Sequence, residues 1–167
     1  TGEGRLHTPI NLAFDDAGTM YVADPARGRV GLYDAQSRYL GAITEVDGMK
    51  PTDVAVASNR VYVADLQRAQ VAVYDRATRQ RLFTIPRKPG REEDRLFQPT
   101  NLAVDSGGRL CVSDSGAFCV KVFDAEGNHL RTFGTHGDGP GQFARPKGIS
   151  LDRVGRIDLL HGHVDLI

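Results

Sequence analysis

One pattern repeats along this 167-residue chain, and it restricts the fold more than any single residue does. A proline is followed by a short apolar run, a polar turn, and a second apolar run that ends in aspartate. Complete copies begin at Pro9, Pro51 and Pro99, and a shorter copy begins at Pro146, so successive copies start 42, 48 and 47 residues apart. Self-similarity at this period is typical of propellers, solenoids and repeat arrays.

The apolar runs of each copy predict four short strands with turns rich in Asp and Gly between them. In the first copy the strands are expected at residues 11–14, 19–23, 29–33 and 39–43. Four short antiparallel strands per repeat predict an all-β fold made of propeller blades. The chain then divides into 1–8 (the tail of a preceding inter-blade linker), 9–45 (blade 1), 51–85 (blade 2), 86–98 (a charged inter-blade insertion), 99–134 (blade 3), 135–145 (a Gly-rich linker) and 146–167 (a partial, degenerate blade 4).

The repeats resemble those of NHL-repeat β-propellers, and the resemblance covers essentially the whole chain. It is carried by Tyr21-Val22-Ala23-Asp24 with residues 30–34, by Cys111-Val112-Ser113-Asp114 with residues 120–124, and most specifically by the glycine-rich stretch 134–143 that leads to residues 146–149. The resemblance implies a six-bladed ring, of which this chain holds about three and a half blades.

The ring is therefore expected to be incomplete. Either the chain is a fragment of a longer propeller, or it is an open arc that completes itself by oligomerising. The last copy is degenerate, because Asp158 falls where the other copies have Tyr21, Tyr62 or Cys111, and His161 falls where they have aspartate. In both cases the end blades would expose apolar faces and unpaired strand edges, which predicts self-association.

Bulk composition excludes few functions. Lys and Arg together number 21, as do Asp and Glu, so no overall charge favours nucleic acid. No apolar run approaches the roughly 18 residues that a membrane-spanning helix needs. Cys111 and Cys119 flank one predicted hairpin and are interpreted as free thiols, with a cross-strand disulfide as the alternative. The sequence contains no nucleophile elbow, phosphate loop or Cys/His ligand cluster, and it assigns no compartment.

Two sets of aspartates recur at strand ends. The first set follows the second strand of each copy, and the second set follows the third strand: Asp24, Asp65 and Asp114, then Asp34, Asp75 and Asp124. A catalytic ring of carboxylates is conceivable. We favour a structural role, in which each aspartate accepts backbone N–H bonds from its own turn.

Asn11, Asp53 and Asn101 occupy one equivalent position at the start of the first strand, beside the expected central channel. Their oxygens could hold a hard cation such as Ca²⁺, as in the calcium-dependent lactonase-like propellers that this arrangement resembles. The alternative is that they cap the strand entrance and line a hydrated channel. The fourth copy has Gly148 at this position.

The stretch 76–98 holds seven cations and three acids. Its candidate binding residues are Arg87, Lys88, Arg91 and Arg95. Some NHL propellers that this stretch resembles bind RNA through a basic face, but we read no aromatic residues interleaved for base stacking, and a solvated loop is the alternative. His161 and His163 could share one face of a strand and ligate a metal, although no third ligand is evident.

The sequence therefore predicts a non-catalytic NHL-type scaffold that binds a protein or another macromolecule, with no cofactor. The first alternative is a fragment of a metal-dependent propeller enzyme, a lyase or lactonase-like hydrolase, with its site in the channel and Ca²⁺ as the metal. The second alternative is RNA binding through the stretch 76–98. Because propellers carry unrelated functions, the fold by itself does not choose among them.

Overall fold

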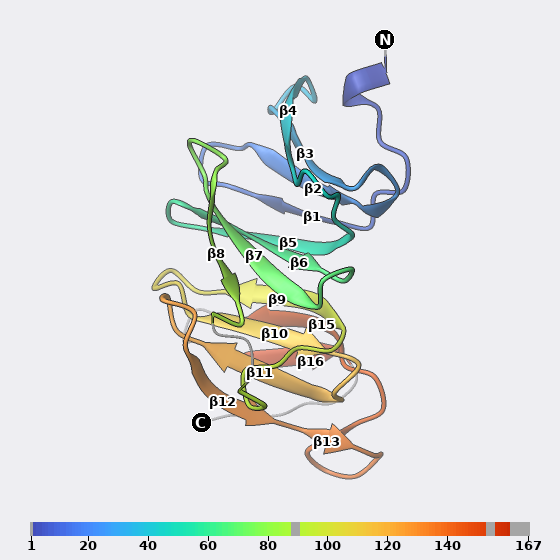
Figure 1. Ribbon diagram of the computed structural model, residues 1–167, viewed down its shortest axis with the longest axis vertical. Coiled ribbons are helices and arrows are strands. Elements are labelled where there is room, and N and C mark those ends of the chain that lie inside the picture. The colour runs from blue at the N-terminus through green and yellow to red at the C-terminus, as the bar shows by residue number, and fades with distance from the viewer. Residues whose placement is uncertain (1, 88–90, 153–155, 161–167) are drawn as a thin grey trace.

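The computed structural model describes residues 2–87, 91–152 and 156–160. It contains three four-stranded antiparallel sheets, each with its strands in chain order, stacked one beside the next (Figure 1). The strands are β1 (Asn11–Phe14), β2 (Met20–Asp24), β3 (Arg29–Tyr33), β4 (Tyr39–Thr44), β5 (Pro51–Ala57), β6 (Arg60–Asp65), β7 (Gln70–Asp75), β8 (Arg81–Ile85), β9 (Pro99–Val104), β10 (Leu110–Asp114), β11 (Cys119–Phe123) and β12 (His129–Phe133). The predicted all-β architecture of propeller blades is confirmed.

A two-stranded sheet, β15 (Lys147–Leu151) with β16 (Ile157–Leu160), follows the three blades. The sequence did not predict the short parallel pair β13 (Thr135–His136) and β14 (Gln142–Phe143), which lies in the Gly-rich linker. Two single-turn 3₁₀ helices, η1 (Gly2–Gly4) and η2 (Pro25–Arg27), complete the described elements. Neither is long and apolar enough to cross a membrane.

Each blade has two ends with different contents. The linker end carries the start of the first strand, the turn between the second and third strands, and the segments that join successive blades. The turn end carries the other two hairpin turns. At the turn end of blade 1, Asp15 shows why these turns form, since its carboxylate accepts N–H bonds from Ala17 at 3.0 Å and Thr19 at 2.8 Å, while Gly18 takes φ 80°.

The cores lie between blades, not within them. Val54 of β5 packs with Tyr21 and Ala23 of blade 1, and Leu102 of β9 packs in the same way with Tyr62 of blade 2. Each first strand thus places a branched side chain against the preceding blade. The small residues next to them face the following blade: Ala55 and Ala103 belong to the cores shared with blades 3 and 4.

The two end blades differ in their outer faces. On β1, Leu12 and Phe14 are 53% and 59% exposed, whereas Val54 at the position equivalent to Leu12 is 3% exposed. On β16, Ile157 and Leu159 pack against blade 3, while Asp158 points away and is exposed. The sequence placed Asp158 in the correct register, since it lies opposite Ser150 as Tyr21 lies opposite Ala13.

Both cysteines are buried free thiols. In the β10–β11 pairing, Cys111 lies opposite Val122 and Cys119 lies opposite Asp114, so they are not cross-strand neighbours. Burial raises the pKa of each thiol to about 11, which disfavours the reactive thiolate. The alternative of a disulfide is wrong, because the register keeps the two side chains at different rungs of the ladder.

The repeat supplies a matched pair of variants for the inter-blade core. We expect Leu102→Ala to lower the free energy of unfolding by about 2–4 kcal/mol, because Leu102 is 6% exposed in a packed core. Leu12→Ala, the same change at the equivalent position of blade 1, should lower it by less than about 0.5 kcal/mol. Urea unfolding followed by circular dichroism measures both. Equal losses would contradict the assignment of an open face to blade 1.

Candidate functional site

The aspartates at the ends of β2, β6 and β10 tie the linkers to the blades. Asp24 accepts N–H bonds from His7 at 2.8 Å and Thr8 at 3.0 Å. Burial opposes ionisation of Asp24, but these backbone donors outweigh it and hold its pKa below the ordinary value. The sequence predicted donors from the aspartate's own turn and missed those from the linker 16–17 residues earlier.

Asp114 makes the fullest set of these contacts. Its carboxylate accepts N–H bonds from Phe97 and Gln98 in the preceding linker and from Gly116 and Ala117 in its own turn. The aspartates after β3, β7 and β11 accept from their own turns, as predicted; Asp124, for example, binds the N–H groups of Glu126 and Asn128. These oxygens stabilise loops, which leaves the idea of a catalytic carboxylate ring without support.

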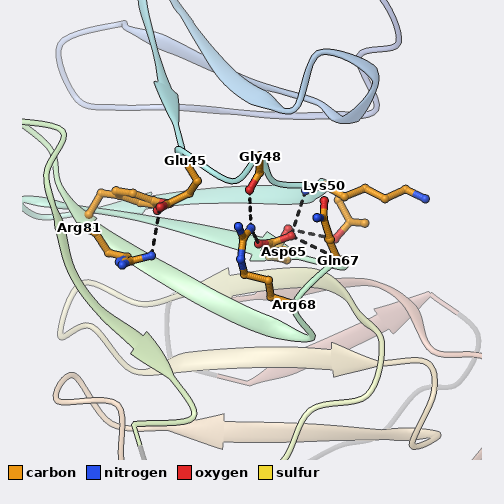
Figure 2. Close-up of polar contacts among 10 residues, drawn as sticks. Glu45, Gly48, Lys50, Asp65, Gln67, Arg68 and Arg81 are labelled. Atoms are coloured by element: carbon orange, nitrogen blue, oxygen red, sulfur yellow. Dashed lines mark hydrogen bonds and ion pairs between the residues drawn. The ribbon is translucent and has the colours of Figure 1, made fainter.

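Figure 2 shows a polar junction between blades 1 and 2. Arg68 donates to Asp65 at 2.9 Å and to the carbonyl oxygen of Gly48. Glu45 accepts from Arg81 at 3.1 Å and from the hydroxyl of Tyr74 at 2.6 Å. Burial, and then the bond to Glu45, raise the pKa of Tyr74, so its hydroxyl stays protonated as a donor. The junction fixes one linker against two blades.

The structure brings Asn11, Asp53 and Asn101 together. With Gly148 they line one pocket of about 450 Å³ along the first strands β1, β5, β9 and β15. Each reaches the next blade: Asn11 Nδ2 donates to Thr52 O at 2.8 Å, Asp53 Oδ2 accepts from Leu102 N at 2.8 Å, and Asn101 Oδ1 accepts from Gly148 N at 3.1 Å. We call these three contacts the inter-blade clasp.

Asp53 is the carboxylate of the clasp. Only 8% of the residue is exposed, and its second oxygen accepts the N–H of Val54 at 2.8 Å. Burial raises its pKa from 3.8 to about 6, against the opposing effect of bonds from Leu102, Val54 and Asn101. Within the described ranges no three His, Cys, Asp or Glu side chains converge on a metal-sized site. The Ca²⁺ site that the sequence offers here as an alternative stays a prediction.

The basic stretch is less free than its composition indicates. Arg91 pairs with Glu93 at 2.5 Å, and Arg95 lies 3.6 Å from Glu92. Arg76 and Arg81 pair with acids of blade 1. Lys88 lies outside the described residues, as do His161 and His163.

The view that this stretch has no interleaved aromatics is wrong. Arg87 stacks over the ring of Phe83 at 4.5 Å, and Arg95 stacks over Phe97 at 4.6 Å. Phe97 is 45% exposed. Arg68, Arg91 and Arg95 share a pocket of about 540 Å³ with apolar residues that include Leu96 and Phe97. The stretch therefore offers mixed apolar and paired charged groups at the linker end.

A third pocket, which sequence reasoning missed, lies between blades 3 and 4. Its volume is about 430 Å³ and it is lined by Gln98, Thr100, Ser115, Gly116, Phe118, Arg145 and Lys147. The sequence did contain an indication of this pocket. Arg145 and Lys147 flank the last repeat proline, where the preceding copy has the uncharged Gln98 and Thr100.

Comparison with known proteins agrees with this geometry. The model of the family described as NHL repeat matches residues 98–123. The protein called brain tumor from Drosophila melanogaster is 27% identical over 140 residues, which is 79% of this chain but 13% of that protein. The predicted resemblance to NHL-repeat propellers is confirmed, and the chain spans a small part of this relative.

Solved structures show the same fold. A hydrazine synthase from Kuenenia stuttgartiensis aligns with TM-score 0.71 at 19% identity, covering 90% of this chain and 41% of that chain. Virginiamycin B lyase from Staphylococcus aureus aligns with TM-score 0.69 at 10% identity, covering 92% and 48%. A chain of the mitotic checkpoint complex aligns with TM-score 0.66 at 13% identity, covering 89% and 42%. At these identities the likeness concerns the fold.

The buried carboxylate of the clasp gives a pH prediction. Because the folded pKa of Asp53 is about 6 and its ordinary value is 3.8, the folded state binds the proton more tightly, and this group lowers stability as pH rises from about 4 to about 6. Asp53→Asn removes the ionisation. The stability of the variant relative to wild type should therefore increase by roughly 2–3 kcal/mol between about pH 4 and pH 7.

Urea unfolding at several pH values measures this difference. The amide is compatible with the site, since Asn11 and Asn101 occupy the equivalent positions of blades 1 and 3. Asp124→Asn, at a partly buried turn aspartate, is the control and should not reproduce the rise. A pH-independent difference between Asp53→Asn and wild type would show that Asp53 is ionised at no extra free-energy cost.

Proposed function

Taking the chain as a series of NHL repeats folded into propeller blades, we propose that it is a non-catalytic scaffold that binds a protein partner through its linker end. The repeated carboxylates support this proposal, because they hold backbone N–H groups of linkers and turns. The pockets near Phe97 and near Arg145 both open among linker-end residues, and loops on a rigid scaffold are the usual place for recognition.

The observation that carries the proposal is a difference in charge pairing between the two ends. At the turn end, arginines make contacts within the described structure: Arg38, Arg76 and Arg109 pair with turn aspartates, and Arg60 and Arg79 donate to backbone carbonyls. At the linker end, the side chains of Arg145 and Lys147 make no ion pair or hydrogen bond with another described residue. Exposed groups with unused binding capacity thus gather at one end.

Two exposed apolar residues allow a matched test of this assignment. Phe97 at the linker end is 45% exposed, and Leu82 on the outer strand β8 is 49% exposed. We expect Phe97→Glu to reduce the amount of specifically bound partner at least about fivefold, since buried aromatic anchors dominate interfaces. Leu82→Glu should leave partner binding unchanged.

Affinity isolation with the immobilised chain, followed by quantitative mass spectrometry, compares the proteins bound by wild type and both variants. Hydrogen exchange of the purified complex then locates the protected amides. Loss of binding in Leu82→Glu with retention in Phe97→Glu, or protection confined to the turn end, would contradict the proposal.

The metal-dependent enzyme is the second candidate, because Asn11, Asp53 and Asn101 do line one pocket. Ca²⁺ takes six to eight oxygen ligands, and both Asp53 oxygens already accept backbone N–H bonds. We expect calorimetric titration to show no Ca²⁺ binding tighter than about 1 mM. Stoichiometric binding in the micromolar range that disappears in Asp53→Ala, and persists in the control Asp124→Ala, would favour the enzyme instead.

A further inference from the structure

The pocket between blades 3 and 4 is built by three segments that are distant in sequence. Gln98 and Thr100 come from the start of blade 3, and the β10–β11 turn supplies Ser115, Gly116 and Phe118. Arg145 and Lys147 come from the start of the last sheet. The pocket therefore lies across the blade boundary at the linker end, with its two cations on one side and the turn of blade 3 on the other.

Its charge is unbalanced. Neither Arg145 nor Lys147 has an ion pair or hydrogen bond to another described residue, and no carboxylate belongs to the lining. Asp114 precedes the lining residue Ser115, but its oxygens accept four backbone N–H groups. The 540 Å³ pocket is different, because Glu92 belongs to its lining and pairs with Arg95. Among the described residues, two cations thus face a cavity without a compensating anion.

The backbone at Phe118 is a second, independent observation. Phe118 has φ 53°, in the left-handed region that large residues rarely adopt. The equivalent turns of blades 1 and 2 use Gly28 with φ 59° and Ala69 with φ 49° at this position. The turn therefore needs no large side chain for folding. The Phe118 ring lies edge-on to the ring of His136, with 4.3 Å between the ring centroids, and forms an aromatic wall of the pocket. Unfavourable backbone conformations of this kind are concentrated at functional sites.

The charge of the ligand distinguishes a phosphate group from a carboxylate as the occupant of this pocket. A phosphorylated side chain carries a charge of about −1.5 to −2 and three acceptor oxygens, which matches two cations and a nearby amide donor. The amide of Gln98 makes no side-chain hydrogen bond to another described residue, so it is available as that donor. A carboxylate would neutralise one of the two cations only. Charge-assisted bonds to Arg and Lys are the stronger class of hydrogen bond.

We propose that this pocket binds a phosphorylated serine or threonine of the protein partner. The inference rests on the proposed function, and it names the chemical group that the scaffold recognises. Arg145 and Lys147 bind the phosphate, Gln98 donates to it, and the ring of Phe118 packs against the neighbouring peptide.

Fluorescence anisotropy of a labelled peptide tests the proposal. The probe is fluorescein-Ala-Gly-Ala-phosphoserine-Ala-Gly-Ala, added to the 167-residue chain at about 0.15 M salt, where long-range charge effects are screened. The unphosphorylated peptide, the peptide with Glu in place of phosphoserine, and a labelled single-stranded RNA of equal charge are the comparison ligands. We expect binding of the phosphopeptide, with the Glu peptide at least about fivefold weaker and the unphosphorylated peptide weaker still.

Arg145→Gln and Lys147→Gln should each weaken phosphopeptide binding at least about fivefold. Lys50→Gln is the matched control, because Lys50 is an exposed, unpaired cation at the position of blade 2 equivalent to Arg145. It should leave the affinity unchanged. Phe118→Gly should also weaken binding while preserving the fold, since Gly28 already serves this turn in blade 1. Circular dichroism verifies folding of every variant.

Equal binding of the phosphorylated and unphosphorylated peptides, tighter binding of the RNA, or equal losses in Lys50→Gln and Arg145→Gln would overturn the proposal. The comparison between phosphorylated and unphosphorylated peptides uses wild-type protein, so it holds even if a variant misfolds. If the phosphopeptide does not bind but partner binding still depends on Phe97, the scaffold function stands and only the phosphate proposal fails. If neither phosphopeptide binding nor Phe97-dependent partner binding is found, the linker end is not the binding face.

Discussion

The structure depends on the burial of one blade against the next. A four-stranded blade cannot bury both of its faces by itself, so each repeat gains its core from its neighbours. Val54 and Leu102 show how this works, because the branched side chain at the start of one blade fills the space beside the tyrosine of the preceding blade. The polar contacts follow the same logic, with Asp65, Asp114 and the inter-blade clasp all connecting segments that packing has already brought together.

The inter-blade clasp shows that side chains at equivalent positions can differ in the free energy needed to bury them. Asn11 and Asn101 bridge to the next blade with uncharged amides, whereas Asp53 uses a carboxylate in a buried site. A carboxylate can accept from Val54 and Leu102 at once, which an amide with a single oxygen does less well. The gain in acceptors is offset by the desolvation of a charge. Burial of the Asp53 carboxylate therefore raises its pKa, whereas the neutral Asn11 and Asn101 of the flanking blades bury no charge.

Sequence reasoning succeeded where the physical cause is local. The turn aspartates were predictable because Asp34 and Asp124 accept N–H bonds from residues two to four positions later. The strands were predictable from short apolar runs bounded by turn residues. Sequence reasoning failed where the contacts join residues that are far apart in the chain. The donors of Asp24 lie 16–17 residues away, and the insertion is held by the buried Lys121, whose amine donates to the carbonyl oxygen of Glu93 at 2.7 Å. Summing charges over 76–98 likewise missed that Arg91 and Arg95 pair with acids of the same stretch, and that Arg76 and Arg81 pair with acids of blade 1.

The repeats also separate what the fold requires from what it permits. The residue before each repeat proline is Thr8, Lys50, Gln98 or Arg145, and the residue after it is Ile10, Thr52, Thr100 or Lys147. The backbone at these positions recurs from blade to blade, so packing does not dictate a cation at either place. The same holds for the left-handed turn position, where Gly28, Ala69 and Phe118 share one conformation. Lys147 and Phe118 both depart from the other copies, and they line one pocket together with Arg145. A ligand explains this coincidence better than folding does.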